Sequence, residues 1–376
     1  MTASKYQNQF VSKIQTASLP TYRAALAAAK ANTSGPLIIN LIGDSTFAGA
    51  GSNGAPMNSN NDRNNGPMVK LEAAYLAGSG LTANGADIWG WNHSNLVTSY
   101  ALFNNDVTLG SWSYSNHPNT VSLGGALFRA TSAAGGDFTW NGKNRVFDKI
   151  SIYYDTFATN GSFEWFIDGV SQGVVNEAVA SDFKVVTVTG LALTTHTVAI
   201  RWISGTADFI GIETFDTTNK QSVRIRNWGQ IAAPSAQFVN NPTAWSWPSA
   251  LIKMRTMAPA HLSIIEIGMI NDWRTAVAPA STAANLSTTM TNVGGACIIF
   301  GPNRADTALT PQVTQEATVS ACAALADGKT KVFHDVKTNL GVWSTMNGLG
   351  QMFDQQHPNG AGYTAIWNDI YSSKLA

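Results

Sequence analysis

The pattern of hydrophobic and polar positions divides the chain into regions of two structural types. From about residue 106 to residue 216, short β-type runs alternate with turn signals such as Asn141-Gly142 and Asp168-Gly169, a spacing typical of an antiparallel sandwich. On both sides of that region, apolar runs of strand type alternate with stretches of helical spacing. Such alternation predicts a parallel, doubly wound sheet. We therefore expect an α/β protein that carries an inserted antiparallel β-sandwich.

The positions at which this pattern changes set the expected domain boundaries. Residues 1–35 are expected to form a helical lead-in, and residues 36–104 together with 217–376 the α/β domain. Residues 105–216 form the expected insert. Because the chain must leave the sheet and return to it, both ends of the insert should lie close together and the insert should fold as a unit.

The candidate catalytic residues lie in two short motifs near the ends of the chain. An apolar run from Leu37 to Ile42 stops at Gly43-Asp44-Ser45, which places a serine at the carboxyl end of a buried strand. Sites in open α/β sheets collect at that edge. Asp354 and His357, with two residues between them, lie near the other end of the chain, a spacing that lets the carboxylate reach back to the imidazole. The three side chains are candidates for a nucleophile, a base and an orienting carboxylate.

These two motifs, in this order, resemble the first and last motif blocks of the SGNH (GDSL-type) hydrolase family. The resemblance covers the α/β domain and excludes the insert. It implies a flavodoxin-like doubly wound sheet and a serine esterase in which Ser45, His357 and Asp354 form the catalytic triad. Within the insert, the runs around residues 152–154 and 163–169 resemble those of carbohydrate-binding jelly rolls.

The same resemblance implies where an oxyanion hole would lie. Its donors would be the Ser45 N–H, a backbone N–H of the second block and the amide of Asn271. The second block reads Asn-Trp-Gly-Gln-Ile-Ala, so Gly229 is the expected donor and Ala232, which replaces a family glycine, the alternative. The third block, Gly-Met-Ile-Asn-Asp, departs from the family spacing, and its Asp272 is expected to brace the loop.

Around these groups we expect further side chains that contact the substrate. They are Asp44, Trp228, Ala232 and His93. In the insert, aromatic side chains such as Trp112, Trp140 or Trp165 could stack on sugar rings, because a flat apolar ring matches the apolar face of a pyranose; a purely structural insert is the alternative reading.

Composition excludes several classes of function. Charged residues make up 12% of the chain and its formal net charge is zero, which argues against nucleic acid or an anionic membrane surface as a partner. No apolar run is long enough to span a membrane. The histidines and the two cysteines do not fall at metal-ligand spacing, and no phosphate-binding loop is present, so we predict no metal and no cofactor.

The N-terminal stretch bears on localisation. Residues 1–19 are polar and lack an apolar segment of signal-peptide length. We therefore expect a protein that stays inside the cell, is released by lysis or is associated with a virion such as a phage tail. Homo-oligomerisation is left open.

The sequence thus predicts a serine esterase that removes O-acetyl groups from a polysaccharide. Low charge and many aromatic residues suit a neutral glycan better than a lipid. Two alternatives remain: a lipase or thioesterase of the same fold, and a catalytically inactive glycan-binding protein. The sequence does not identify the glycan or the position of its acyl group.

Overall fold

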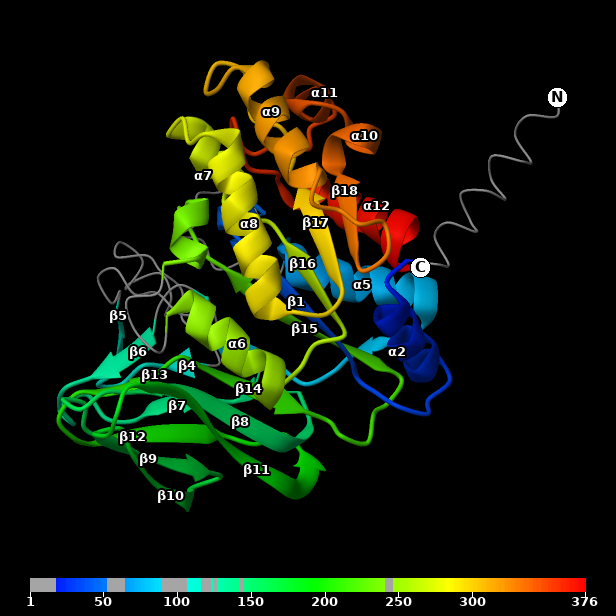
Figure 1. The fold of residues 1–376 in the computed structure, drawn as a ribbon. Helices are drawn as coiled ribbons and strands as arrows, with labels where there is room; N and C mark the ends of the chain where they lie inside the picture. Colours follow the sequence, from blue (N-terminus) through cyan, green and yellow to red (C-terminus); the bar gives the residue numbers. More distant parts are fainter. Residues whose placement is uncertain are drawn as a thin grey trace.

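The computed structural model shows an α/β domain and a β-rich domain packed side by side (Figure 1). The described residues are 18–52, 65–89, 107–115, 123–124, 127–142, 145–240 and 246–376.

A six-stranded parallel sheet forms the centre of the α/β domain. In spatial order its strands are β18 (Lys331–Asp335), β17 (Cys297–Gly301), β16 (Leu262–Ile265), β1 (Leu37–Gly43), β15 (Ser222–Gly229) and β2 (Thr82–Ala83). The strand that is first along the chain lies in the interior, and the order reverses on either side of it. This is the flavodoxin-like, doubly wound arrangement that was predicted, with its switch point at β1.

Helices cover both faces of this sheet (Figure 1). They are α2 (Pro20–Lys30), α3 (Ser45–Ala48), α5 (Pro67–Ser79), α6 (Trp247–Met257), α7 (Met269–Arg274), α8 (Pro279–Val293), α9 (Gln312–Ala323), α10 (Val336–Leu340), α11 (Trp343–Gly348) and α12 (Gly360–Ile370), with a 3₁₀ turn at Ser235–Phe238 and a π turn at Tyr371–Leu375. Successive strand side chains point to opposite faces, so Leu41 packs with α2, α5 and α12, whereas its neighbour Ile42 packs with α6 to α9.

The β-rich domain consists of antiparallel sheets, as the alternation of short runs and turns predicted. One sheet holds β10 (Val170–Asn176), β9 (Ser162–Ile167), β12 (Val198–Ser204), β7 (Phe138–Trp140) and β4 (Val107–Thr108). A second holds β11 (Asp182–Thr194), β8 (Phe147–Thr156), β14 (Gly211–Phe215) and β3 (Asp87–Trp89), and a third holds β13 (Ala207–Phe209), β6 (Leu127–Ala130) and β5 (Ser113–Ser115).

The insert begins earlier in the chain than residue 105, the boundary expected from the sequence. β3 lies before that boundary, yet it pairs with β14 in an antiparallel sheet of the insert. A strand of three residues is too short to show a period-2 pattern, which explains why the sequence did not reveal it.

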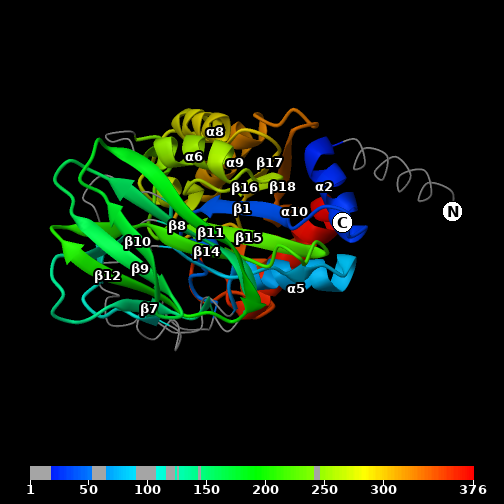
Figure 2. The ribbon, with the colours of Figure 1, turned by 90° about the horizontal axis from the view of Figure 1, so that it is seen from below.

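The insert also shares a hydrophobic core with the α/β domain. Trp89, Tyr153 and Phe183 of the insert belong to the same buried cluster as Trp228 of β15. Figure 2 shows β8, β11 and β14 lying next to β15 and α6. The insert is therefore continuous with the α/β core, and its removal would expose this shared apolar surface.

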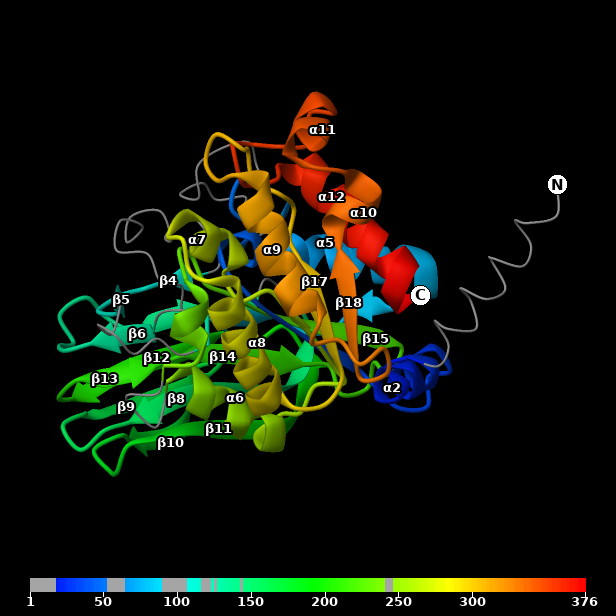
Figure 3. The same cartoon turned by 45° about the horizontal axis from the view of Figure 1, so that its top comes forward.

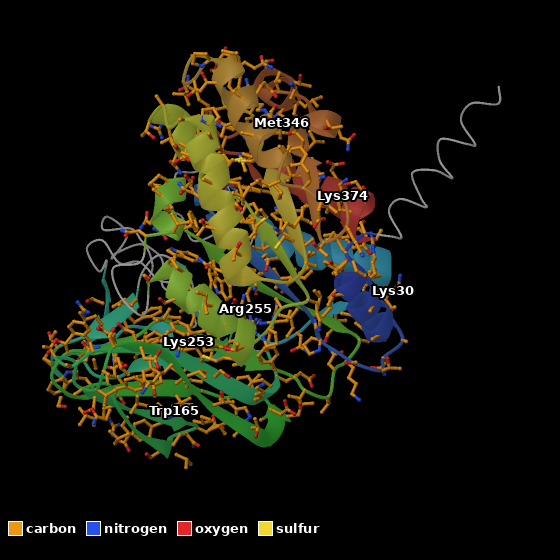
Figure 4. The ribbon with its side chains drawn as sticks, in the orientation of Figure 1. Lys30, Trp165, Lys253, Arg255, Met346 and Lys374 are labelled. Atoms are coloured by element: carbon orange, nitrogen blue, oxygen red, sulfur yellow. The ribbon has the colours of Figure 1, made fainter. Side chains whose placement is uncertain are left out.

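The tryptophans expected to stack on sugars lie inside the sandwich instead. Trp112, Trp140 and Trp165 are each at most 3% exposed, and they belong to the core cluster of the insert; Figure 4 labels Trp165 within this domain. Their large apolar area stabilises the sandwich, so these three side chains do not offer a sugar-binding surface.

A buried ionic cluster crosses the boundary between the two domains. Glu213 of β14 accepts hydrogen bonds from Arg224 Nε at 3.0 Å and from Arg226 Nε at 2.7 Å. The Tyr153 hydroxyl donates to the same carboxylate at 3.0 Å. All four side chains are at most 2% exposed, so the strand that carries both arginines is tied to the insert by charge-assisted bonds.

Candidate active site

The candidate nucleophile lies where the first strand of the sheet ends. β1 closes at Gly43, and Ser45 is the first residue of α3. The Asp44 carboxylate accepts a hydrogen bond from the Thr46 N–H at 2.9 Å and so caps this helix. Strand, cap and helix start hold Ser45 at the carboxyl edge of the sheet, as the motif predicted.

A chain of two hydrogen bonds links Ser45 to the loop before α12. Ser45 Oγ lies 2.9 Å from His357 Nε2, and His357 Nδ1 lies 2.8 Å from Asp354 Oδ2. When Nδ1 carries the proton and donates it to Asp354, Nε2 is left as the acceptor for the Ser45 hydroxyl. The structure thus brings together all three residues that the sequence proposed as a triad.

Asp354 is fixed by its own loop. Its Oδ1 accepts from the N–H groups of Gln356 and His357, both at 2.7 Å. Partial burial alone would raise the pKa of Asp354, but the hydrogen bonds and the charge of His357 outweigh it and lower the pKa below its ordinary value. The group is therefore ionised at neutral pH and can orient the imidazole.

A buried carboxyl pair lies behind the nucleophile, and sequence reasoning missed one of its members. Glu266, directly after β16, accepts from the N–H groups of Asp44 and Met269. Burial first, and the neighbouring Asp44 charge second, raise the pKa of Glu266 well above its usual range. The signal was present in the sequence, because a glutamate inside an apolar strand run needs a buried partner.

Asp44, which was expected to contact a substrate, lies behind the nucleophile with its oxygens hydrogen-bonded to the protein itself. Its side chain is fully buried, and its oxygens accept from the Thr46 N–H and from the Asn271 side-chain amide. Burial raises the pKa of Asp44. Its place is structural: it joins the end of β1 to the start of α7.

The two alternative donors of the second block are in different environments. The Gly229 N–H donates to the side chain of Asn227 at 2.9 Å, so it is not free to face an oxyanion. A Cβ at Gly229 would lie 2.1 Å from the backbone nitrogen of Ala48, which makes Gly229 a close-packing glycine. Ala232 is exposed, and within the described part of the chain its N–H donates to no acceptor.

Ala232 has a left-handed backbone conformation, with φ of 56°. The left-handed conformation is unfavourable for an L-residue and not for glycine. This explains why the motif that the sequence resembles has a glycine at this position. We expect Ala232→Gly to raise the free energy of unfolding by about 0.5–1 kcal/mol, because relief of backbone strain exceeds the extra unfolded-state entropy. Urea unfolding measures the change.

A matched site provides the control for this prediction. Ala276 also has a positive φ, 55°, and is exposed just after α7, so Ala276→Gly should stabilise by a similar amount. A loss of stability in Ala232→Gly alone would mean that the methyl group makes contacts worth more than the strain.

Asn271 lies in α7, close to the nucleophile. Its amide nitrogen donates to Asp44 Oδ2 and to the Ala233 carbonyl, each at 3.1 Å. Both N–H groups therefore have partners, and donation to a ligand would replace or share one of these bonds. Gly268, with φ of 77°, starts this helix, and a Cβ there would lie 2.0 Å from the Ala233 carbonyl oxygen. Asp272 braces the loop as expected, accepting from the Ser235 N–H and the Thr282 hydroxyl.

Two other predicted substrate contacts have different outcomes. Trp228 is fully buried and packs edge-to-face against Trp89, so it belongs to the shared core and does not line the site. His93 lies outside the described residues. Within the described ranges, no group of three or more histidine, cysteine, aspartate or glutamate side chains could hold a metal ion, and no helix there is both long and apolar enough to cross a membrane.

The parallel sheet and its strand order define a flavodoxin-like, doubly wound fold with a serine at its carboxyl edge and an additional β-rich domain. A solved structure of a peptidoglycan O-acetylesterase has a similar fold, with a TM-score of 0.68 and 15% identity over 96% of this chain and 95% of that one. A weaker similarity, with a TM-score of 0.24, is to a family two carbohydrate esterase from Clostridium thermocellum; there the identity is 14% over 69% of this chain and 96% of that one. No protein-family model and no curated protein sequence matches the chain.

Proposed function

We propose that this protein is a serine esterase that removes O-acetyl groups from a polysaccharide. The observation that carries the proposal is the hydrogen-bonded chain from Ser45 Oγ through His357 to Asp354, at 2.9 and 2.8 Å. That arrangement at the carboxyl edge of a doubly wound sheet is a nucleophile, a base and an orienting carboxylate. The choice of an acetylated polysaccharide as substrate is supported by the fold shared with a peptidoglycan O-acetylesterase.

The residues take the following parts in the reaction. His357 Nε2 accepts the Ser45 proton as Oγ attacks the acetyl carbonyl, and the imidazolium then protonates the leaving sugar oxygen. Asp354 holds the imidazole in the required tautomer and stabilises its positive charge. A water molecule, deprotonated by His357, afterwards releases acetate from Ser45 and restores the hydroxyl.

The oxyanion of the tetrahedral intermediate needs hydrogen-bond donors on the side of Ser45 that faces away from His357. We assign this role to the Ser45 and Ala232 N–H groups, neither of which donates to an acceptor within the described part of the chain. We choose the N–H of Ala232 over that of Gly229, because the Gly229 N–H already donates to Asn227. Asn271 is the third donor, releasing one of its two present hydrogen bonds as charge develops on the substrate.

Acetate release from a panel of O-acetylated polysaccharides tests the proposed function, alongside p-nitrophenyl esters of increasing acyl length. The expected result is acetate release from at least one polymer, with acetyl preferred over longer acyl chains. A preference for long chains would favour a lipase or thioesterase. Absence of turnover on every ester, p-nitrophenyl acetate included, would leave the inactive glycan-binding protein.

Replacing Asn271 tests the assignment of the oxyanion hole. Asn271→Ala is expected to lower kcat by roughly 10²–10³, the usual effect of losing one such donor. KM should change little, because the donor acts mainly on the transition state. Steady-state kinetics on p-nitrophenyl acetate separate the two constants.

Asn285 offers a matched control for that substitution. Its amide donates to Ser235 Oγ at 2.7 Å within the same region of the fold, but it has no proposed role in the reaction. Asn285→Ala should cost stability and leave kcat within about twofold of the parent. A raised KM with unchanged kcat in Asn271→Ala would make Asn271 a ground-state contact and remove it from the oxyanion hole.

A further inference from the structure

A cavity lies against the triad loop, on the side of Asp354. It has a volume of about 400 Å³ and opens to solvent. Its lining comes from four separate segments: the end of α7, the loop before α9, helix α11 and the triad loop itself. The lining residues are Arg274, Leu309, Trp343, Asn347, Phe353, Asp354, Gln355 and Gln356. Figure 3 shows α7 and α11 at the same end of the α/β domain.

Arg274 places a positive charge beside the site. It lies three residues after Asn271 in α7, so both side chains project from one side of that helix. Its Nη1 donates to the side chain of Gln356 at 3.5 Å, and Gln356 directly precedes His357. The guanidinium therefore contacts the residue that directly precedes the proposed base.

The guanidinium of Arg274 lacks a carboxylate partner within the described ranges. Arg129 and Arg304, by contrast, each pair with aspartate at 2.6 and 2.9 Å. A guanidinium presents five N–H donors in a planar fork that fits a carboxylate with two parallel hydrogen bonds. Arg274 is exposed at the wall of the cavity, and such an unmatched charge favours an anionic ligand.

The remaining lining suits a sugar ring. The Trp343 ring is half-buried, and its Nε1–H donates to the Asp354 carbonyl at 2.9 Å, which fixes the ring at the cavity wall. An indole face offers a flat apolar surface for a pyranose. The side-chain amides of Asn347 and Gln356 supply donors and acceptors for hydroxyl groups.

We infer that this cavity is a subsite for a carboxylate-bearing sugar residue of the acetylated glycan, with Arg274 pairing the carboxylate and Trp343 contacting the ring. The inference rests on the proposed function and narrows its substrate to an acidic polysaccharide, whereas the composition of the chain favoured a neutral glycan. It makes Arg274 a residue that determines specificity and leaves the triad chemistry unchanged.

Kinetics on an acidic and a neutral polymer test the subsite. We would compare kcat/KM for acetate release from O-acetylated polygalacturonate and O-acetylated xylan in the parent, Arg274→Gln and Arg274→Lys. In Arg274→Gln, the ratio of the acidic to the neutral value should fall at least tenfold, mostly through KM. Arg274→Lys should recover part of it, and the parent's preference should weaken as salt is added.

Arg255 provides the charge-matched control. It lies on α6, where Figure 4 labels it, and donates to the Thr291 carbonyl at 3.2 Å. Arg255→Gln removes the same charge and should leave the acidic-to-neutral ratio unchanged. An unchanged ratio in Arg274→Gln, or an equal fall in Arg255→Gln, would overturn the subsite.

Binding to the Ser45→Ala protein separates the subsite from catalysis. Calorimetry would compare trigalacturonate with its methyl ester, which lacks only the charges. Tighter binding of the free acid by Ser45→Ala, and loss of this preference in the double variant Ser45→Ala/Arg274→Gln, would support the subsite. If the parent protein then hydrolyses no acetylated polymer, only the proposed function fails. Equal binding of the two trisaccharides by an enzyme that releases acetate leaves the function and removes the subsite.

Discussion

Replacing Ser45 with alanine is expected to lower kcat for ester hydrolysis by roughly 10⁴- to 10⁶-fold, the scale on which loss of a triad nucleophile acts. The side chain is 6% exposed, and its hydroxyl has the His357 imidazole as its hydrogen-bond partner. Removal of one oxygen at a helix start changes little packing, so the fold should persist. Hydrolysis of p-nitrophenyl acetate measures the loss, and circular dichroism checks the fold.

His357→Ala should lower kcat almost as far, and the double substitution hardly further, because triad members act as one unit. Thr46→Ala is the matched control: this buried neighbour in α3 has a hydroxyl without a hydrogen-bond partner in the described structure, and its loss should keep most of the activity. Near-parental hydrolysis by Ser45→Ala would contradict the triad assignment.

The triad residues could be proposed from the sequence because each lies in a local pattern. A serine that closes an apolar strand run, and an aspartate three residues before a histidine in a loop, are recognisable without knowledge of the tertiary structure. Their order along the chain then placed Ser45 and His357 at one edge of the sheet. The alternation of strands and helices predicted the parallel, doubly wound sheet, and the family resemblance implied its flavodoxin-like order.

What the sequence left open depends on contacts between distant segments. Gly229 and Ala232 are equivalent in the motif, and only the bond to Asn227 and the φ of Ala232 distinguish them. Trp228 looked accessible beside the motif, yet the insert packs against it through Trp89. Arg274 belongs to no motif, and its importance emerges only when α7 is seen beside the triad loop.

Replacement of Glu213 is expected to lower the stability of the protein more than any other substitution proposed for it. Glu213→Ala should lower the free energy of unfolding by about 3–5 kcal/mol, because it leaves the buried Arg226 without its carboxylate partner and Arg224 with only Asp87, at 3.7 Å. Arg224 and Arg226 are each 1% exposed and cannot regain water without opening the domain boundary. The shift of the urea midpoint measures the loss.

A surface pair gives the matched control for this substitution. Asp137 pairs with Arg201 at 3.0 Å, but the arginine side chain is 49% exposed. Asp137→Ala also breaks an arginine–carboxylate pair, yet it should cost less than about 1 kcal/mol, because water replaces the lost partner. A similar loss in both variants would show that burial at the domain boundary adds nothing.

The pH dependence distinguishes charge pairing from packing at Glu213. Burial alone would raise the pKa of this carboxyl, but the charges and hydrogen bonds of Arg226 and Arg224 outweigh it and lower the pKa overall. A carboxyl with a lowered folded-state pKa stabilises the protein above its unfolded-state pKa, about 4.3, and loses that contribution as the pH falls through the folded-state value. The stability difference between the parent and Glu213→Ala should therefore stay constant from pH 7 to about pH 5 and shrink only in stronger acid. A difference that did not change with pH even in strong acid would mean that the substitution acts through the cavity it leaves and not through the two arginines.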